Sequence, residues 1–195
     1  MNTMMRKSVL GIAGLAVAGG LAAGPLNHGT TDTIDTRAAA VAVQADKVDK
    51  SKLIPHGVQG NQSRIDLGDE QTDNVKAIIA ATKKSGMDER AAVVAIATSL
   101  QESKLENLGH LGERNDHDSQ GLFQQRPSSG WGTVEQITDP EYSTMAFLKG
   151  LKQVDGWQDM PLTGAAQTVQ VSAYPDHYAQ WERQAADLVA EHWNS

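Results

Sequence analysis

Apolar side chains recur every three to four residues over much of the chain after residue 68, which is the spacing of amphipathic helices. The helices predicted from this spacing cover, approximately, 70–84, 88–104, 139–154, 162–171 and 181–192. The second is apolar on nearly every side between residues 91 and 100, as is typical of a helix at the centre of a core. No pair of strands with convincing turn residues is found, so the sequence predicts a mainly α fold.

The N-terminus has the pattern of an export signal. Arg6 and Lys7 precede an uncharged stretch, 8–23, that is rich in apolar residues and ends in small ones. We therefore predict a signal peptide or N-terminal anchor over 1–24 and a secreted, cell-wall-associated protein. Contact with a membrane is expected only through this segment, if it is not cleaved.

Residues 25–68 show no sustained apolar periodicity, which predicts a flexible linker. We expect this linker to be dispensable, so that a chain beginning near Ile65 folds and keeps its activity. The rest of the chain, 69–195, is predicted to form one domain. The chain has no cysteine, so its stability has to come from packing without disulfides.

The charge of the chain argues against nucleic acid as a partner. Its formal net charge is −7, and the acidic excess lies after residue 68. Such a domain repels phosphate backbones, and no basic stripe with interleaved aromatic residues is present. Sugars are recognised by hydrogen bonds and aromatic faces, so glycan strands remain possible partners. We expect a monomer that needs no cofactor.

Two short strings carry the chemistry. Gln101-Glu102-Ser103 closes the most apolar helix, and Gly121-Leu122-Phe123-Gln124 follows in a region rich in Gly, Asn and Asp. A glutamate at the edge of a core is costly in its charged form, so burial is expected to raise its pKa. A proton donor at neutral pH needs such a shift, and cleavage of a glycosidic bond needs such a donor.

Together these strings resemble the catalytic domains of lytic transglycosylases and goose-type lysozymes, which cut the sugar backbone of peptidoglycan in secreted wall proteins of Gram-positive bacteria. The resemblance covers about 69–193 and implies a lysozyme-like helical domain whose central buried helix bears the catalytic glutamate, here Glu102. In these families a Gly-Leu-Met-Gln string lines the sugar cleft. It implies that Gln124 and Phe123, which stands in the place of Met, contact the substrate.

Lytic transglycosylases also have an Ala-Tyr-Asn string that brings a tyrosine hydroxyl near the acid. Ala173-Tyr174-Pro175 stands in that place, so the resemblance implies a substrate-binding role for Tyr174 and none for the missing Asn. Gln101 beside the acid and Trp131 in a Gly-rich loop complete the predicted substrate contacts, although both can also serve packing.

The resemblance leaves a second carboxylate unassigned. Goose-type lysozymes add aspartates around the Gly-Leu-Met-Gln string, where Glu113, Asp116 and Asp118 are available here, but Gln125-Arg126 follows the string. Lytic transglycosylases need no such partner. The acidic and His residues of 110–118 match no zinc spacing or complete EF-hand, so no metal site is predicted.

The leading interpretation is an exported muralytic enzyme that cuts the β-1,4 bond between N-acetylmuramic acid and N-acetylglucosamine, with Glu102 as general acid and base. The alternative is a catalytically decayed module that binds peptidoglycan or has a structural role in the wall. The intact Glu102 favours the enzyme, whereas the missing Asn and the unassigned second carboxylate keep the alternative open.

Overall fold

The computed structural model of the chain describes residues 48–115, 117–172 and 174–195. The predicted signal segment, 1–24, lies outside the described residues, as do the first part of the predicted linker and Asp116. Among the residues that are described, no helix is long and apolar enough to cross a membrane.

The described residues form seven α-helices and no β-strand, which confirms the prediction of a mainly α fold. The long helices are α3 (Asp69–Lys84), α4 (Glu89–Ser103), α6 (Pro140–Leu151), α7 (Leu162–Gln170) and α8 (Glu182–His192). They lie where the apolar periodicity predicts helices. The short helices α2 (Lys50–Leu53) and α5 (Val134–Ile137) and four 3₁₀ turns, η1 (Gly112–Arg114), η2 (Pro127–Ser129), η3 (Trp157–Asp159) and η4 (His177–Trp181), complete the fold.

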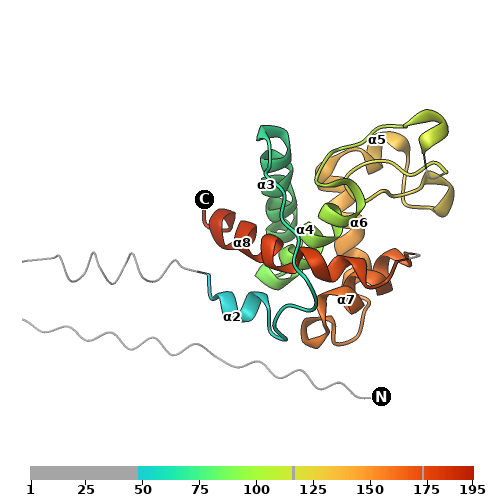
Figure 1. Ribbon diagram of the computed structural model, residues 1–195. Helices are drawn as coiled ribbons and strands as arrows, with labels where there is room; N and C mark the ends of the chain where they lie inside the picture. Colours follow the sequence, from blue (N-terminus) through green and yellow to red (C-terminus); the bar gives the residue numbers. More distant parts are fainter. Residues whose placement is uncertain (1–47, 116, 173) are drawn as a thin grey trace, which may run out of the picture.

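Helix α4 is the centre of the molecule and packs against α3, α6, α7 and α8 (Figure 1). Asp88 caps its start, because the Asp88 carboxylate accepts a hydrogen bond from the backbone N–H of Ala91 at 3.1 Å. Every side chain from 91 to 100 is buried, and small alanines allow the neighbouring helices to approach closely. The C-terminal end of α4, where Glu102 lies, is therefore fixed relative to its neighbours.

A buried ion pair joins α4 to α8 and α2. Arg90 Nη1 lies 2.7 Å from Glu182 Oε1, and both side chains are almost wholly buried. The same guanidinium donates to the carbonyl oxygen of Leu53 at 2.7 Å. Burial raises the pKa of Glu182, and the hydrogen bond and charge of Arg90 lower it in part. The start of α4 is thereby tied to two elements that are distant in sequence.

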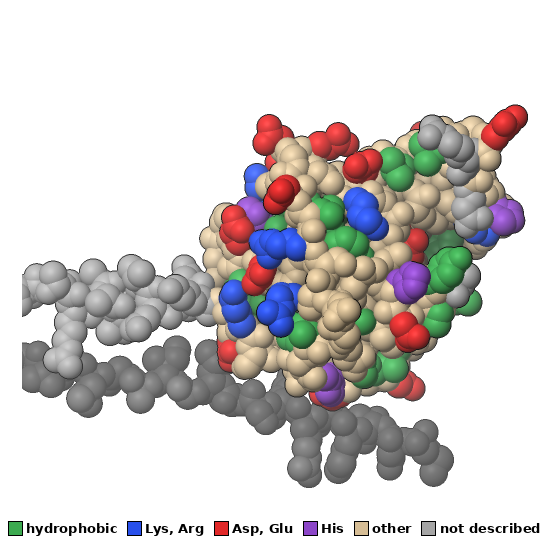
Figure 2. All heavy atoms as spheres, in the orientation of Figure 1, with side chains coloured by type: hydrophobic (Ala, Val, Ile, Leu, Met, Phe, Trp, Pro, Cys, Tyr) green, Lys and Arg blue, Asp and Glu red, His purple; other side chains and the backbone are tan. Residues whose placement is uncertain are grey.

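The described part of the predicted linker is packed onto the helices, contrary to our expectation of a flexible segment. Leu53 is fully buried in the core, and Ile65 packs against it. Lys50 and Arg64 both form ion pairs with Asp187 of α8, at 3.1 and 3.0 Å. Figure 2 shows basic side chains gathered over this region, beside acidic ones. We call residues 54–68, which connect α2 to α3, the strap.

Candidate active site

The end of α4 is set by two residues with left-handed backbone. Lys104 and Leu105 have φ of 58° and 64°, so the helix ends directly after the segment that carries Glu102. Such conformations cost roughly 1 kcal/mol or more in residues other than glycine. Two side chains of α3 hold them in place, because Gln71 Nε2 donates to the Lys104 carbonyl at 2.7 Å and Asn74 Nδ2 to the Leu105 carbonyl at 2.9 Å.

The second motif forms a tight turn beside the end of α4. Two backbone hydrogen bonds of 3.0 Å between Gln120 and Gln125, the residues on either side of the motif, close this turn. Gly121 has a φ of 75°, and a Cβ there would lie 2.0 Å from the carbonyl oxygen of Ile137, so the turn requires glycine. Ser103 Oγ donates to the carbonyl of Leu122 at 2.8 Å. The two sequence motifs are thus joined directly.

The carboxylate of Glu102 accepts hydrogen bonds from two elements that follow in sequence. The hydroxyl of Tyr178, a buried residue of η4, donates to Glu102 Oε1 at 2.6 Å. Burial, followed by the adjacent Glu102, raises the pKa of Tyr178, so this hydroxyl keeps its proton at physiological pH. Gln170 Nε2, at the end of α7, reaches Glu102 Oε1 at 3.4 Å and donates to the carbonyl of Phe123 at 2.9 Å.

The preceding residue, Gln101, is also oriented by η4. Its Oε1 accepts from Gln180 Nε2 at 3.1 Å and from the Trp181 indole at 2.9 Å. The ammonium group of Lys104 lies 4.8 Å from the centre of the Trp181 ring. Burial lowers the pKa of Lys104, while the charge of Glu102 raises it. Glu102 therefore has a lysine in its electrostatic environment.

Glu102 lines a cleft of about 700 Å³. Its walls carry amide side chains, which can both donate and accept hydrogen bonds, and aromatic rings with flat apolar faces. Among these side chains are Gln101, Gln124, Gln170, Trp131 and Tyr174. Of the described residues that line the cleft, only Glu102 has a carboxylate. Arg126 also lines the cleft, so one acid and one base offset each other among amides, hydroxyls and rings. A lining without net formal charge suits a neutral, hydroxyl-rich ligand.

Phe123 is placed differently from the other residues that the sequence predicts to contact substrate. Its side chain is 1% exposed and stacks on Phe147, with ring centroids 5.0 Å apart. The ring is thus part of the core. The part of Phe123 that contacts Gln170 is its backbone carbonyl. The other predicted contacts, Gln101, Gln124, Trp131 and Tyr174, do line the cleft.

The tyrosine that donates to Glu102 is not the one that the sequence motif indicates. Tyr174 is 64% exposed and stacks on His177 at the edge of the cleft, with ring centroids 4.9 Å apart. Neither Tyr178 nor Gln170 is among the site residues that the sequence predicts. The apolar stripe that begins at Trp181 extends back to Tyr178 at helical spacing, which would have indicated that Tyr178 is buried but not what it contacts.

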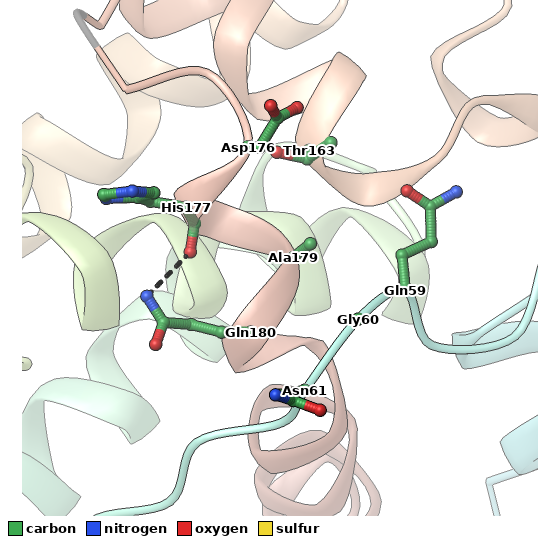
Figure 3. Close-up of a pocket in the computed structure, with 8 residues that line it drawn as sticks. All are labelled: Gln59, Gly60, Asn61, Thr163, Asp176, His177, Ala179 and Gln180. Carbon is green, nitrogen blue, oxygen red and sulfur yellow. Dashed lines mark hydrogen bonds between the residues drawn. The ribbon is translucent and has the colours of Figure 1, made fainter.

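The strap holds η4 through hydrogen bonds. Gln62 Nε2 donates to the Ala179 carbonyl at 3.0 Å, and the Ser63 backbone N–H donates to the Gln180 carbonyl at 2.8 Å. Ser63 Oγ also donates to Gln180 Oε1 at 2.6 Å, which links the strap to Gln101 through one side chain. Figure 3 shows the strap beside η4, around a neighbouring hollow.

Asp118, one of the acidic residues available as a second carboxylate, is engaged within its own loop. Its two oxygens accept from the backbone N–H and the hydroxyl of Ser128, each at 2.8 Å. These hydrogen bonds lower the pKa of Asp118. Glu113 is exposed, and no second carboxylate can be assigned from the described residues. Within the part of the chain that the structure describes, no group of His, Asp or Glu is arranged to hold a metal ion.

Neither the models of protein families nor the curated proteins that we searched contain a match to this chain.

Proposed function

We propose that this chain is a peptidoglycan-cleaving enzyme with a lysozyme-like domain, acting on the β-1,4 bond between N-acetylmuramic acid and N-acetylglucosamine. The observation that carries the proposal is the position of Glu102. This glutamate ends a buried helix, lines a cleft of amides and aromatic rings, and accepts a hydrogen bond of 2.6 Å from a buried tyrosine. The hydrogen bond from Ser103 Oγ to the Leu122 carbonyl joins the motif that contains Glu102 to the Gly121–Gln124 motif.

In the proposed reaction Glu102 acts first as acid and then as base. The protonated carboxyl transfers its proton to the glycosidic oxygen as the bond between that oxygen and the anomeric carbon breaks. The resulting carboxylate then removes a proton from the incoming hydroxyl, supplied by water or by the 6-hydroxyl of the same sugar. Each step returns Glu102 to the form that the next step needs, so a single carboxylate suffices when the substrate supplies the nucleophile.

The remaining cleft residues have the chemistry to hold the sugar rings. The amides of Gln101 and Gln124 can each exchange hydrogen bonds with hydroxyl or N-acetyl groups. The rings of Trp131 and Tyr174 offer faces against which a sugar ring can pack. Tyr178 and Gln170 orient the carboxylate itself. A protein with this role acts on the wall, outside the membrane, as the export pattern at the N-terminus predicts.

The direct test is to incubate the protein with purified peptidoglycan and analyse the released fragments by mass spectrometry. Fragments cut after N-acetylmuramic acid support the proposal. An anhydro ring at the new end identifies attack by the sugar's own hydroxyl, and a free reducing end identifies attack by water. Binding to the walls without release of fragments would instead favour the decayed binding module.

A further inference from the structure

A second hollow adjoins the cleft on the far side of Trp131. It has a volume of about 840 Å³ and is lined by the end of α3, by α6 and by the loop at 130–131. Trp131 is half-buried and lines both this hollow and the cleft that contains Glu102. The two hollows are therefore neighbours that share the side chain of Trp131.

Apolar and basic side chains line the second hollow. Trp131, Tyr142 and Met145 contribute apolar surface. The charged side chains that line it are Lys84, Lys149 and Lys152, and none of its described lining residues is acidic. We call this hollow the lysine pocket. Its charge contrasts with the net charge of −7 of the whole chain, which indicates an anionic ligand.

One lysine of the pocket is available for such a ligand. Lys84 forms an ion pair with Glu141, and Lys152 donates to the Ser85 carbonyl at 2.6 Å, so both already have a role in the fold. Lys149 is exposed, and its ammonium group makes no hydrogen bond or ion pair with any described residue. Its ammonium group can bind a carboxylate without breaking a contact within the protein.

We propose that the lysine pocket binds the acidic peptide carried by the glycan strand, so that the enzyme acts on strands that bear their peptides. This inference rests on the proposed function. The peptide is attached to the muramic acid, the sugar whose bond is cut, and so leaves the strand close to the cleft. Its alanine methyl groups suit the apolar surface of Trp131 and Met145, and its carboxylates suit Lys149.

A binding experiment tests the pocket independently of catalysis. The isotope-labelled protein is titrated with a soluble stem peptide, L-Ala-D-Glu with its following residues and free carboxylates, and NMR follows the Trp131 indole and the α6 amides. We expect these signals to shift, the affinity to fall about fivefold or more in Lys149→Glu, and Lys149→Arg to retain it. Lys76→Glu, a charge reversal at an exposed lysine of α3 outside the pocket, is the matched control and should bind normally.

A second measurement links the pocket to cleavage. Rates are compared on glycan strands that keep their peptides and on the same strands after an amidase has removed the peptides. Lys149→Glu should lower kcat/KM about fivefold on the first substrate and leave it nearly unchanged on the second.

The two proposals fail in different ways. Cleavage of neither substrate by the unaltered protein would contradict the proposed function, whatever the peptide does. Absence of peptide-induced shifts at Trp131 and α6 would overturn the lysine pocket, even if the walls are cleaved. A response of these signals only to a poly(glycerol phosphate) chain would also overturn the lysine pocket as a peptide site. So would shifts that depend on protein concentration alone, which would assign the pocket to contact with a second copy of the chain.

Discussion

Glu102 shares its hydrogen bonds with two side chains far away in the sequence, Tyr178 and Gln170. A hydroxyl that donates to a carboxylate favours the ionised form, whereas a general acid must be protonated when the bond breaks. The contact between Tyr178 and Glu102 therefore both positions the acid and influences the pH range over which it can work. Because the pKa of Tyr178 is raised, the hydroxyl stays a donor throughout that range.

We predict that Tyr178→Phe moves the alkaline limb of the pH–activity profile to higher pH. Loss of the donor favours the protonated form of Glu102, and activity falls as pH rises through the point where that proton is lost. We also expect turnover to fall about tenfold, because the carboxyl is less well oriented, equivalent to roughly 1.4 kcal/mol of barrier.

The matched control is Tyr174→Phe, which removes a hydroxyl from an exposed ring at the edge of the same cleft. Its pH profile should stay in place, and a change in KM alone is compatible with a role in substrate binding. A Tyr178→Phe profile that coincides with that of the unaltered protein would show that this hydroxyl does not influence the acid.

Gly121 is the second residue on which the local geometry depends. We predict that Gly121→Ala lowers the free energy of unfolding by about 2 kcal/mol or more. The added Cβ would clash with the Ile137 carbonyl, and alanine would also have to adopt the left-handed backbone conformation of residue 121. Gly112 also has a positive φ but open space around it, so Gly112→Ala should cost only roughly 1 kcal/mol. Urea unfolding measures both, and equal losses would contradict the close approach at Gly121.

At the scale of elements, the site is assembled from the ends of helices. The end of α4 supplies Glu102, the end of α7 supplies Gln170 and η4 supplies Tyr178. Of these, η4 is a short 3₁₀ turn, and short turns of this kind depend on tertiary contacts. The strap provides such contacts through Gln62 and Ser63.

We therefore predict that α2 and the strap are needed together, contrary to the expectation that the sequence alone supports. A chain beginning at residue 66 lacks α2 as well as most of the strap. Its free energy of unfolding should be about 2 kcal/mol or more below that of a chain beginning at 48, because the buried Leu53 of α2 is lost from the core. Its activity should also fall, since η4 loses the hydrogen bonds that hold Tyr178 in place. Equal stability and equal wall lysis of the two chains would show that the strap is dispensable.

At the scale of the whole molecule, the parts of the fold that the sequence predicts are those set by local pattern. The five long helices follow from apolar periodicity, and α4 from its nearly continuous apolar run. The sequence does not predict the short helix α2, because four residues are too few to show a helical periodicity. Its place in the fold depends on the burial of Leu53. The sequence predicts a linker in place of the strap because the strap is polar. Its side chains bind backbone groups of η4 and α8, and composition does not reveal such contacts.

The same distinction applies to the site. Glu102, Gln101 and Gln124 could be predicted because two short strings identify them, and the structure places all three at one cleft. Tyr178 lies 76 residues from Glu102 along the chain, and no spacing connects them. Phe123 was expected at the substrate because it replaces a methionine in the motif, but packing against Phe147 decides its position.

The central claim is that Glu102 supplies the proton that breaks the glycosidic bond, and Glu102→Gln tests it most directly. Glutamine is nearly isosteric and can still accept from Tyr178, so urea unfolding should stay close to that of the unaltered protein. Lysis of purified walls should fall by about 10²- to 10⁴-fold, the usual contribution of general acid–base catalysis. Glu106→Gln, at an exposed residue just beyond α4, is the control and should lyse walls normally. More than a tenth of the original lysis in a folded Glu102→Gln protein would contradict the claim.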